Sequence, residues 1–353
     1  MKDFNTIKIA GKIWSRQELQ EEIRKAHWEV EYWKDFWSLI AQLINQKEHI
    51  IVQSSGSTGK PKQIEIAKEK LLASAAMTCQ YFNLNSEKTA LLCLSTKHIG
   101  GIMMVVRAFY SGLNLLVEKA SANPLKNIQE PIDFVSMVPY QAQACLAEDA
   151  EKLAQIDTVL IGGGTVQKQL EESLVSHGVH AFSSFGMTES ISHFAVREIG
   201  KEDFYQCLEG ITIELSQRGT LILIAPKLLD NKLESNDLIE IVGNNKFTWL
   251  GRSDFAIESG GLKMHPELIE RVLERHFKER IIISSLPSVR FTNEVILIVE
   301  GTERKVDKKI FEELEAYERP KHIFFMRSFI ESNSKINRIK TREALTNLIK
   351  QKR

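Results

Sequence analysis

Short apolar runs alternate with helical patterns through the first half of the chain. Residues 49–52, 91–94 and 158–161 are short, largely apolar runs of the kind that form buried strands. Before and between these runs, apolar residues recur at helical spacing, as in residues 33–44. This alternation predicts a mostly parallel α/β sheet. The other expected strands are 7–10, 64–66, 113–117, 134–138 and 180–183, and the other expected helices are one capped by Ser15, 68–83, 98–109 and 167–177.

Alternating apolar and polar positions replace this pattern from Gly210 onward. Four short strands are expected there, and a small α+β unit follows. The predicted fold class is therefore α/β. Residues 1–253 form a large domain of parallel α/β sheets with a small antiparallel β subdomain, and residues 254–353 form a small α+β C-terminal domain. The antiparallel strands are expected at 211–215, 220–224, 237–242 and 247–250.

Composition narrows the class of protein. The chain has 353 residues, with 46 Lys and Arg balanced by 46 Asp and Glu, so no nucleic-acid partner is expected. Its four cysteines are scattered and form no CxxC pair, which is typical of core thiols in a reducing compartment. The first residues lack an apolar signal core, and no apolar stretch reaches the ~18 residues of a membrane span. A cytoplasmic protein is expected.

The segment 54–62 has the composition of a phosphate-binding loop. It contains three serines, a threonine, two glycines and two lysines, and it connects two predicted strands. It is no Walker A loop, because Ser54 and Pro61 replace the required glycine and hydroxyl residue and a strand follows. A solvated hairpin is the plain structural alternative. Ligands of parallel sheets bind at the carboxyl ends of the strands. The loops after Val52, Leu94, Val138 and Ile161 are therefore expected to converge on one site.

The same string resembles the signature loop of the adenylate-forming superfamily, [S/T]-S-G-[S/T]-T-G-x-P-K-G. The match runs through Lys62 and ends at Gln63, where glycine is usual. That superfamily includes acyl-CoA synthetases and adenylation domains of peptide synthetases. The resemblance implies that the loop holds the phosphates of ATP and that Thr58 contributes to a Mg²⁺ site. The implied phosphate-binding residues are Ser54, Ser55, Gly56, Ser57, Thr58, Gly59 and Lys62.

A second motif, residues 184–189, resembles the family's Y-G-x-T-E, with Phe185 in place of tyrosine. The expected local structure is a loop after a strand that ends at 183, and the plain alternative is a turn before a helix. The resemblance implies that Ser184, Phe185 and Gly186 bind the nucleotide. It also implies catalytic roles for Thr188, which contacts a phosphate, and for Glu189, which holds Mg²⁺.

Further family motifs follow in the family's order. Asp237 matches the ribose-binding aspartate, Arg252 the arginine of G-R-x-D, and Asp254 its hinge. The resemblance implies that Gly260 and Gly261 form a turn that approaches coenzyme A. It also implies that Lys335 is the adenylation lysine, carried on a mobile C-terminal domain. For Asp237 the plain alternative is an ordinary turn, and for Lys335 it is a solvated lysine in a basic tail.

The acyl pocket is implied by residues 98–101, which resemble the family's histidine–glycine segment. His98, Gly100, Gly163 and His193 are the expected substrate contacts, and Gly163 also lines the adenine pocket. The short format of the chain and these segments most resemble the o-succinylbenzoate–CoA ligase branch. Only about 50 residues precede the signature loop, and residues 7–19 resemble the family's N-terminal hairpin, so an internal subdomain of this truncated N-terminal region is expected to be missing. The expected partners for a distal substrate carboxylate are Lys97, His98, His193 and Arg197.

The expected function is therefore ATP-dependent ligation of a small carboxylic acid to coenzyme A through an acyl-adenylate, with Mg²⁺ as cofactor. The expected reaction is formation of o-succinylbenzoyl-CoA in menaquinone biosynthesis. The alternatives are another small aryl- or acyl-CoA ligase, a carrier-loading adenylation enzyme, and, more remotely, a non-catalytic nucleotide-binding protein. A homo-oligomer is compatible with the sequence.

Overall fold

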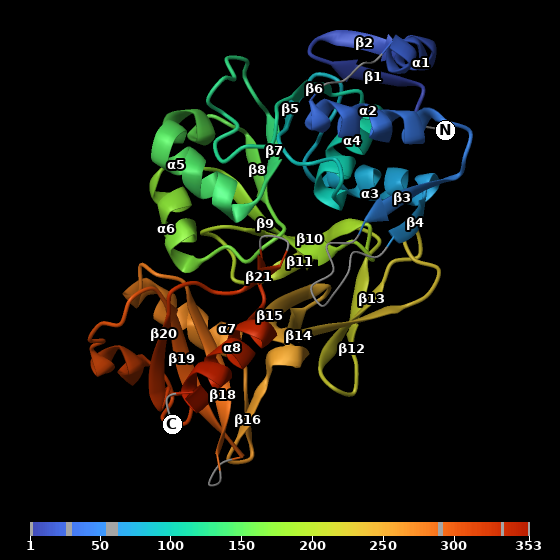
Figure 1. Ribbon diagram of the computed structural model, residues 1–353. Coiled ribbons are helices and arrows are strands. Elements are labelled where there is room, and N and C mark those ends of the chain that lie inside the picture. Colours follow the sequence, from blue (N-terminus) through green and yellow to red (C-terminus); the bar gives the residue numbers. More distant parts are fainter. Residues whose placement is uncertain (1–2, 26–29, 54–62, 289–291, 333–334, 352–353) are drawn as a thin grey trace.

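The chain forms two lobes (Figure 1). The computed structural model describes residues 3–25, 30–53, 63–288, 292–332 and 335–351. The large lobe, blue to yellow, ends with β15, and the small lobe, orange to red, follows it. The elements of the large lobe are β1 (Thr6–Ile9), β2 (Lys12–Ser15), α1 (Arg16–Lys25), α2 (Glu31–Ile44), β3 (His49–Gln53), β4 (Gln63–Ala67), α3 (Lys68–Tyr81), β5 (Thr89–Leu92), α4 (Ile99–Ser111), β6 (Asn114–Val117), β7 (Phe134–Met137), α5 (Pro139–Ala154), β8 (Thr158–Ile161), α6 (Lys168–Ser176), β9 (Ala181–Met187), β10 (Ser192–Glu198), β11 (Tyr205–Cys207), β12 (Thr212–Leu215), β13 (Thr220–Ile224), β14 (Leu233–Gly243) and β15 (Lys246–Arg252).

One mixed sheet of thirteen strands runs through the large lobe, in the order β12-β13-β14-β15-β11-β10-β9-β8-β7-β5-β6-β1-β2. Its centre, from β9 to β1, pairs in parallel, as the alternating pattern predicts. Strands β10 to β15 pair antiparallel. Contrary to the expectation of a separate antiparallel subdomain, these strands continue the same sheet, because β10 turns back and pairs with β9.

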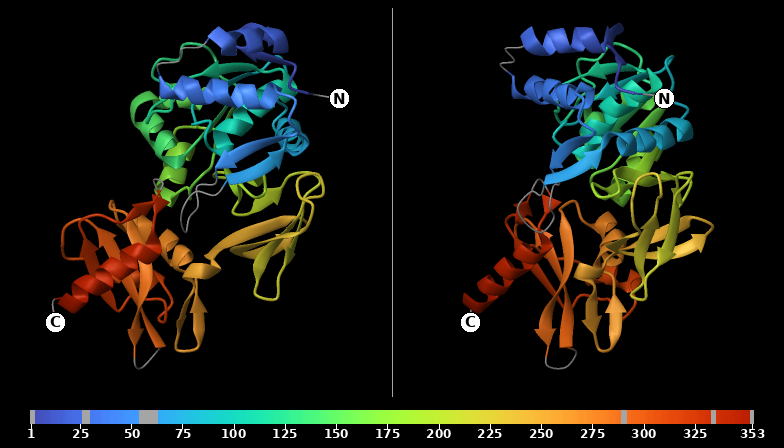
Figure 2. Two further views of the ribbon diagram at one scale, coloured as in Figure 1. Left: turned by 45° about the vertical axis from the view of Figure 1, so that its right-hand side comes forward. Right: turned by 90° about the vertical axis from the view of Figure 1, so that its right-hand side faces the viewer.

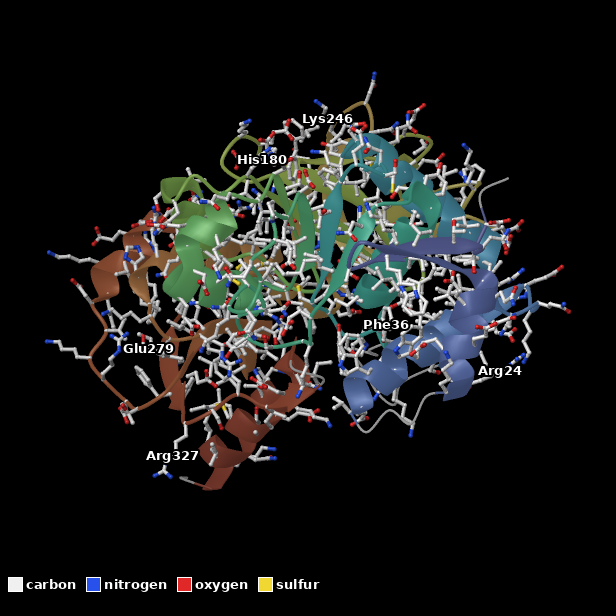
Figure 3. All side chains as sticks on the ribbon, turned by 90° about the horizontal axis from the view of Figure 1, so that it is seen from above. Arg24, Phe36, His180, Lys246, Glu279 and Arg327 are labelled. Atoms are coloured by element: carbon white, nitrogen blue, oxygen red, sulfur yellow. The ribbon has the colours of Figure 1, made fainter. Side chains whose placement is uncertain are left out.

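Helices cover both faces of the parallel centre. Successive residues of a strand point to opposite faces, so Leu92 of β5 joins the cluster that includes α2, α3 and α4, whereas Leu91 joins the cluster with α5 and α6. On α2 the apolar face predicted from helical spacing is buried, with Phe36 1% exposed. Figure 3 shows Phe36 toward the interior and Arg24 of α1 at the rim. The four cysteines are buried, as predicted for core thiols.

Two local features differ from the sequence-based expectation. Strand β3 pairs only with β4, in a separate two-stranded sheet, so the loop after Val52 does not follow a strand of the parallel sheet. Helix α5 was not expected, because Pro139 was read only as the end of a strand; proline also fits the first turn of a helix, where no N–H donor is needed.

The small lobe has its own core. Its apolar clusters contain residues from Ile257 onward, whereas those of the large lobe reach only Trp249. Gly260 and Gly261 form the predicted tight turn, with φ of 58° and 82°, and Pro266 starts α7 as predicted. The elements are η1 (Ser253–Phe255), β16 (Ile257–Ser259), β17 (Leu262–Met264), α7 (Pro266–Leu273), η2 (Glu274–His276), β18 (Ile281–Ser288), β19 (Thr292–Glu300), η3 (Lys308–Glu313), β20 (His322–Met326), β21 (Glu331–Ser332), β22 (Lys335–Ile336) and α8 (Arg338–Gln351).

Candidate active site

The second signature motif lies on a strand rather than in a loop. Strand β9 continues through Met187, and Gly186 pairs with His193 across the β9–β10 hairpin. The expectation that the strand ends at residue 183 was therefore wrong, because β10 supplies hydrogen bonds beyond that point. A Cβ on Gly186 would lie 2.2 Å from the carbonyl oxygen of Ser192, so the close approach of the two backbones requires glycine here.

Thr188 and Glu189 lie in the turn of this hairpin. The turn is held by Ser190, whose hydroxyl accepts a hydrogen bond from the Met187 N–H at 3.0 Å and lies 2.8 Å from the carbonyl oxygen of Ser192. Glu189 is exposed and, within the described part of the chain, makes no hydrogen bond or ion pair. No described residue therefore occupies its carboxylate.

Phe185 and Ser184 join this hairpin to its surroundings. The half-buried ring of Phe185 packs against Phe194 and Phe247, with centroids 5.6 and 5.1 Å away. The Ser184 hydroxyl donates to the carbonyl oxygen of Ile161 at the end of β8. Gly163 follows with φ of 77°, in the left-handed region that favours glycine. The structure therefore places the predicted residue Ser184, within β9, beside the carboxyl end of β8, which Gly163 follows.

Asp237 also comes together with Arg252 and Asp254, although they belong to two separate sequence motifs. Strands β14 and β15 pair Asp237 with Arg252. The Arg252 guanidinium lies 2.7 Å from the Asp254 carboxylate and 3.9 Å from that of Asp237. The indole N–H of Trp249 donates to Asp237 at 3.1 Å, and the Asn236 amide donates to Asp254 at 3.2 Å. The Asn236–Asp237 pair lies inside a strand, so the alternative of a simple turn was wrong.

Two of the residues expected to bind a distal substrate carboxylate already form ion pairs with carboxylates of the protein. Lys97 lies 2.8 Å from Glu31 and 3.1 Å from Asp35. Arg197 forms a buried ion pair with Glu171. His98 is exposed at the N-terminus of α4, and Gly100 lies in its first turn. The position of Lys97 and Arg197 in other ion pairs speaks against their binding a substrate anion.

His193 belongs to a buried polar chain behind the second signature. Its Nδ1 lies 3.5 Å from Nη2 of Arg107, and its Nε2 lies 3.2 Å from the Thr78 hydroxyl. Because a guanidinium can only donate, Nδ1 accepts and Nε2 carries the proton. Burial, and then the nearby Arg107 charge, lower the pKa of His193 well below its usual value. His193 is therefore a neutral imidazole that lies between Arg107 and Thr78 and contacts both.

Arg107 is a functional candidate that sequence reasoning missed. It lies on α4, is 2% exposed, and forms no ion pair with a carboxylate of the described residues. Its Nε has no hydrogen-bond partner there, and its guanidinium lies 6.0 Å from the Phe134 ring. Burial lowers the pKa of Arg107 to about 10. A buried cation without an anion is costly, and the signal in the sequence was a single arginine within the apolar run 102–109.

The remaining predicted residues are only partly described. The loop of Ser54, Ser55, Gly56, Ser57, Thr58, Gly59 and Lys62 lies outside the described residues, as does the side chain of Lys335. The flanking strands β3 and β4 pair up to Gln53 and Gln63. The backbone of Lys335 pairs with Ser332 of β21, and Figures 1 and 2 show β21 on the side of the small lobe that faces the large lobe.

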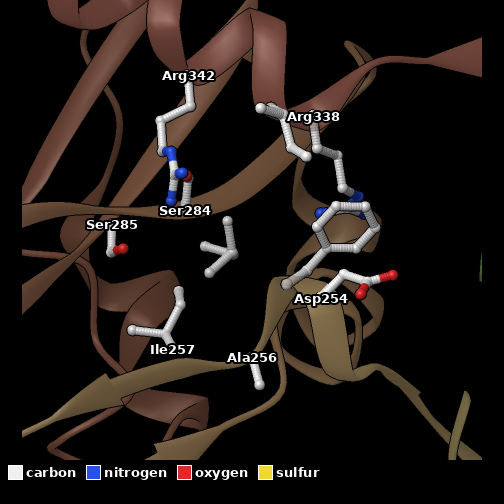
Figure 4. Close-up of a pocket in the computed structure, with 10 residues that line it drawn as sticks. Asp254, Ala256, Ile257, Ser284, Ser285, Arg338 and Arg342 are labelled. Atoms are coloured by element: carbon white, nitrogen blue, oxygen red, sulfur yellow. The ribbon is translucent and has the colours of Figure 1, made fainter. Parts of the chain in front are cut away.

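A small cavity of about 60 Å³ lies beside Asp254 in the small lobe (Figure 4). Ser284, Ser285 and Arg342 also line it. Sites for nucleotides and similar ligands usually measure roughly 300–1,000 Å³, so this cavity is too small for ATP. The described residues contain no group of three or more His, Cys, Asp or Glu that could hold a metal ion. Glu189 nevertheless fits a Mg²⁺ ion that takes its other ligands from phosphates and water.

Comparison with known proteins shows the family of the chain. Residues 13–212, more than half of the chain, match the AMP-binding enzyme family. The chain belongs to this family. Its solved relatives include the acyl-CoA synthetase (AMP-forming)/AMP-acid ligase II-like protein of Dyadobacter fermentans, at 29% identity and a TM-score of 0.62, covering 94% of this chain and 98% of that one. The o-succinylbenzoate CoA synthetase of Bacillus subtilis shares the fold, with a TM-score of 0.74 at 20% identity, over 82% of this chain and 68% of that one.

Curated relatives of this AMP-binding chain include two 2-succinylbenzoate–CoA ligases. That of Escherichia coli is 25% identical over 270 residues, covering 72% of this chain and 59% of the ligase. That of Lactococcus lactis is 25% identical over 317 residues, covering 82% of this chain and 69% of the ligase. The chain thus spans about three fifths of the length of the first relative. No helix in the described ranges is both long and apolar enough to cross a membrane.

Proposed function

We propose that the protein is an AMP-forming acid–thiol ligase that activates a small aromatic dicarboxylate of the o-succinylbenzoate type and transfers it to coenzyme A. Membership of the AMP-binding family supports the reaction class. The substrate class rests on the buried guanidinium of Arg107, which forms no ion pair with any carboxylate of the described residues and whose Nε has no hydrogen-bond partner among them. A cytoplasmic role in menaquinone biosynthesis follows as part of the proposal, since the 2-succinylbenzoate–CoA ligases are relatives.

In the first half-reaction, the substrate carboxylate attacks the α-phosphorus of ATP and releases pyrophosphate. Carboxylate and polyphosphate repel each other, so the protein must supply positive charge and alignment. By their match to the family motifs, the 54–62 loop would bind the leaving phosphates, and Lys335 would bridge carboxylate and α-phosphate. Asp237 would accept hydrogen bonds from the ribose. Glu189 and Thr58 would hold Mg²⁺, which neutralises phosphate charge when bound.

In the second half-reaction, the thiol of coenzyme A attacks the acyl-adenylate and AMP leaves. We propose residues 1–253 and 254–353 as the two domains, with Asp254 as the hinge about which the small one turns. The separate apolar clusters of the two lobes support this division. Asp254 lies in the short η1 segment and is tied to Asn236 and Arg252. The turn of Gly260 and Gly261 would then approach the pantetheine arm.

The substrate class rests on charge compensation. A dicarboxylate keeps one carboxylate after the other has been adenylated, and that group needs a cation. Among the described residues, Arg107 is the buried cation that has no carboxylate as a partner. His193 orients its Nη2. Losing one partner of a buried ion pair costs about 3–5 kcal/mol. Arg107→Met should therefore slow activation of the dicarboxylate by at least about 10².

The test is ATP–pyrophosphate exchange across a panel of acids. The wild-type protein should prefer o-succinylbenzoate over benzoylpropionate, which lacks the second carboxylate. Arg107→Met should lose exchange with the diacid and leave exchange with benzoylpropionate unchanged. The matched control is Arg304→Met, since Arg304 forms an exposed ion pair with Glu279 in the small lobe. Equal loss with both acids would refute the role of Arg107.

The alternatives give different results in the same assay. Preference for fatty acids or another aryl acid would favour a different acyl-CoA ligase. Preference for amino acids, with transfer to a carrier protein instead of coenzyme A, would favour a carrier-loading enzyme. ATP binding without exchange on any acid would favour a non-catalytic nucleotide-binding protein.

A further inference from the structure

Three side chains on one stretch of the large lobe reach the small lobe. Gln169 of α6 donates through Nε2 to the carbonyl oxygens of Glu274 and Phe277, at 3.1 and 3.3 Å. Gln167, just before α6, donates to the Glu274 carboxyl group at 3.3 Å. A third contact is ionic: Arg271 of α7 lies 3.7 Å from Glu171 of α6.

The chemistry of these contacts suits reversible docking. The carbonyl oxygen of Glu274 already accepts from the Phe277 N–H at 3.2 Å, but a carbonyl has two lone pairs and can take a second donor. A glutamine amide carries two N–H groups, one for each of the two carbonyls. Glu171 is 5% exposed and already ion-paired with Arg197, so its carboxylate is held in place whether or not Arg271 arrives. Gln169 is exposed, so water can replace its partners when the lobes separate.

Apolar packing contributes little to this junction. The apolar clusters of the described residues lie either within the large lobe or within the small one. Polar interfaces between domains usually permit relative motion. Among the described residues, the orientation of the small lobe therefore depends on hydrogen bonds of Gln167, Gln169 and the Arg252 N–H, on the ion pair of Arg271 with Glu171, and on the hinge contacts of Asp254.

We propose that Gln169 and Arg271 are positioning residues that dock the small lobe on α6, in the orientation that presents the Lys335-bearing β22 to the large lobe. This rests on the proposed two-step reaction. In the docked state the first half-reaction proceeds, and release of the α6 contacts precedes the second. Neither residue touches the reacting groups; both act by setting the population of the docked state.

The direct test measures lobe separation. The four native cysteines are buried, so spin labels at Lys126→Cys and Lys309→Cys report the distance between lobes by double electron–electron resonance. Gln169→Ala/Arg271→Met should shift the docked population about tenfold, the size expected for losing two hydrogen bonds and a partly exposed ion pair. The matched control is Gln17→Ala/Arg218→Met, because Gln17 bonds to Glu21 and Arg218 forms an exposed ion pair with Glu234, all within the large lobe.

The half-reactions supply the second readout. The double variant should lose about tenfold in pyrophosphate exchange with KM for ATP unchanged, and should convert supplied acyl-adenylate to thioester at the wild-type rate or faster. An unchanged distance distribution would overturn the docking proposal, and so would equal loss of both half-reactions. A wild-type protein without exchange on any acid would instead refute the proposed function, while the distance measurement would still test docking.

Discussion

Glu270 should anchor the segment that carries Lys335, and its removal should unfold that part of the small lobe first. Glu270 of α7 is 5% exposed. Its carboxylate accepts hydrogen bonds from both terminal nitrogens of Arg338, one of them at 2.6 Å, and from the backbone N–H of Ile283 at 2.6 Å. Arg338 starts α8, three residues after Lys335. The ion pair thus ties α7, β18 and the start of α8 together.

The cost of Glu270→Ala follows from what it leaves behind. Removing one partner of a buried ion pair costs about 3–5 kcal/mol. The Arg338 side chain is 22% exposed, so water can reach it and the lower end applies. The Ile283 N–H adds about 1 kcal/mol when it loses its acceptor. The free energy of unfolding of the small lobe should therefore fall by about 4 kcal/mol.

Urea denaturation can separate the lobes. All five tryptophans lie within residues 14–249, so their fluorescence follows the large lobe, whereas far-UV circular dichroism follows both. Glu270→Ala should shift an early circular-dichroism transition and accelerate hydrogen exchange at the Ile283 amide. Glu270→Leu/Arg338→Met leaves no buried charge and should recover most of the loss. A loss below about 1 kcal/mol in the single variant, or a double variant worse than the single, would refute this reasoning.

Four further predictions concern Gly186 in the β9–β10 hairpin, Glu274 at the contact between the lobes, Lys335 and the Asp254 hinge. Gly186→Ala places a Cβ 2.2 Å from a backbone oxygen of β10 and should cost at least about 2 kcal/mol, measured by thermal unfolding; an unchanged Tm would contradict the backbone approach. Burial, and then Glu270, raise the pKa of Glu274 to about 7, so the folded state binds the extra proton and stability should fall as pH rises from about 4.5 to 7. Glu274→Gln should remove that slope in urea titrations across this range, and a persistent slope would assign it to another group. Lys335→Ala should slow pyrophosphate release by about 10²–10³ yet spare thioester formation from supplied acyl-adenylate, and Asp254→Pro should do the reverse; equal loss of both steps in either variant would exclude its assigned role.

Much of the element pattern was predictable because it depends on local periodicity. The strands at β5, β7 and β8 and the helices α2, α3 and α4 follow from apolar spacing alone. The turn of Gly260 and Gly261 and the helix start at Pro266 follow from backbone preferences. Membership of the AMP-binding family was likewise readable from the motifs and is confirmed by the match over residues 13–212.

Partners across long sequence distances were not predictable. Strand β9 extends to Met187 only because β10 folds back beside it, and the antiparallel strands join the main sheet for the same reason. Lys97 and Arg197 form ion pairs with carboxylates that lie far away along the chain. Their charge in the sequence therefore did not show whether they could bind a substrate carboxylate. Arg107, by contrast, resembled an ordinary arginine on a helix.

The sequence by itself therefore determined the local elements, the order of the motifs and the family, because these depend on residue type and spacing. Tertiary structure alone decided which charges remain without a partner. The composition of residues 54–62 predicts phosphate binding, whereas the proposal of a second carboxylate in the substrate depends on the burial of Arg107. Burial and pairing arise from contacts between distant segments. The free-energy cost of a charge is therefore set only when those contacts form.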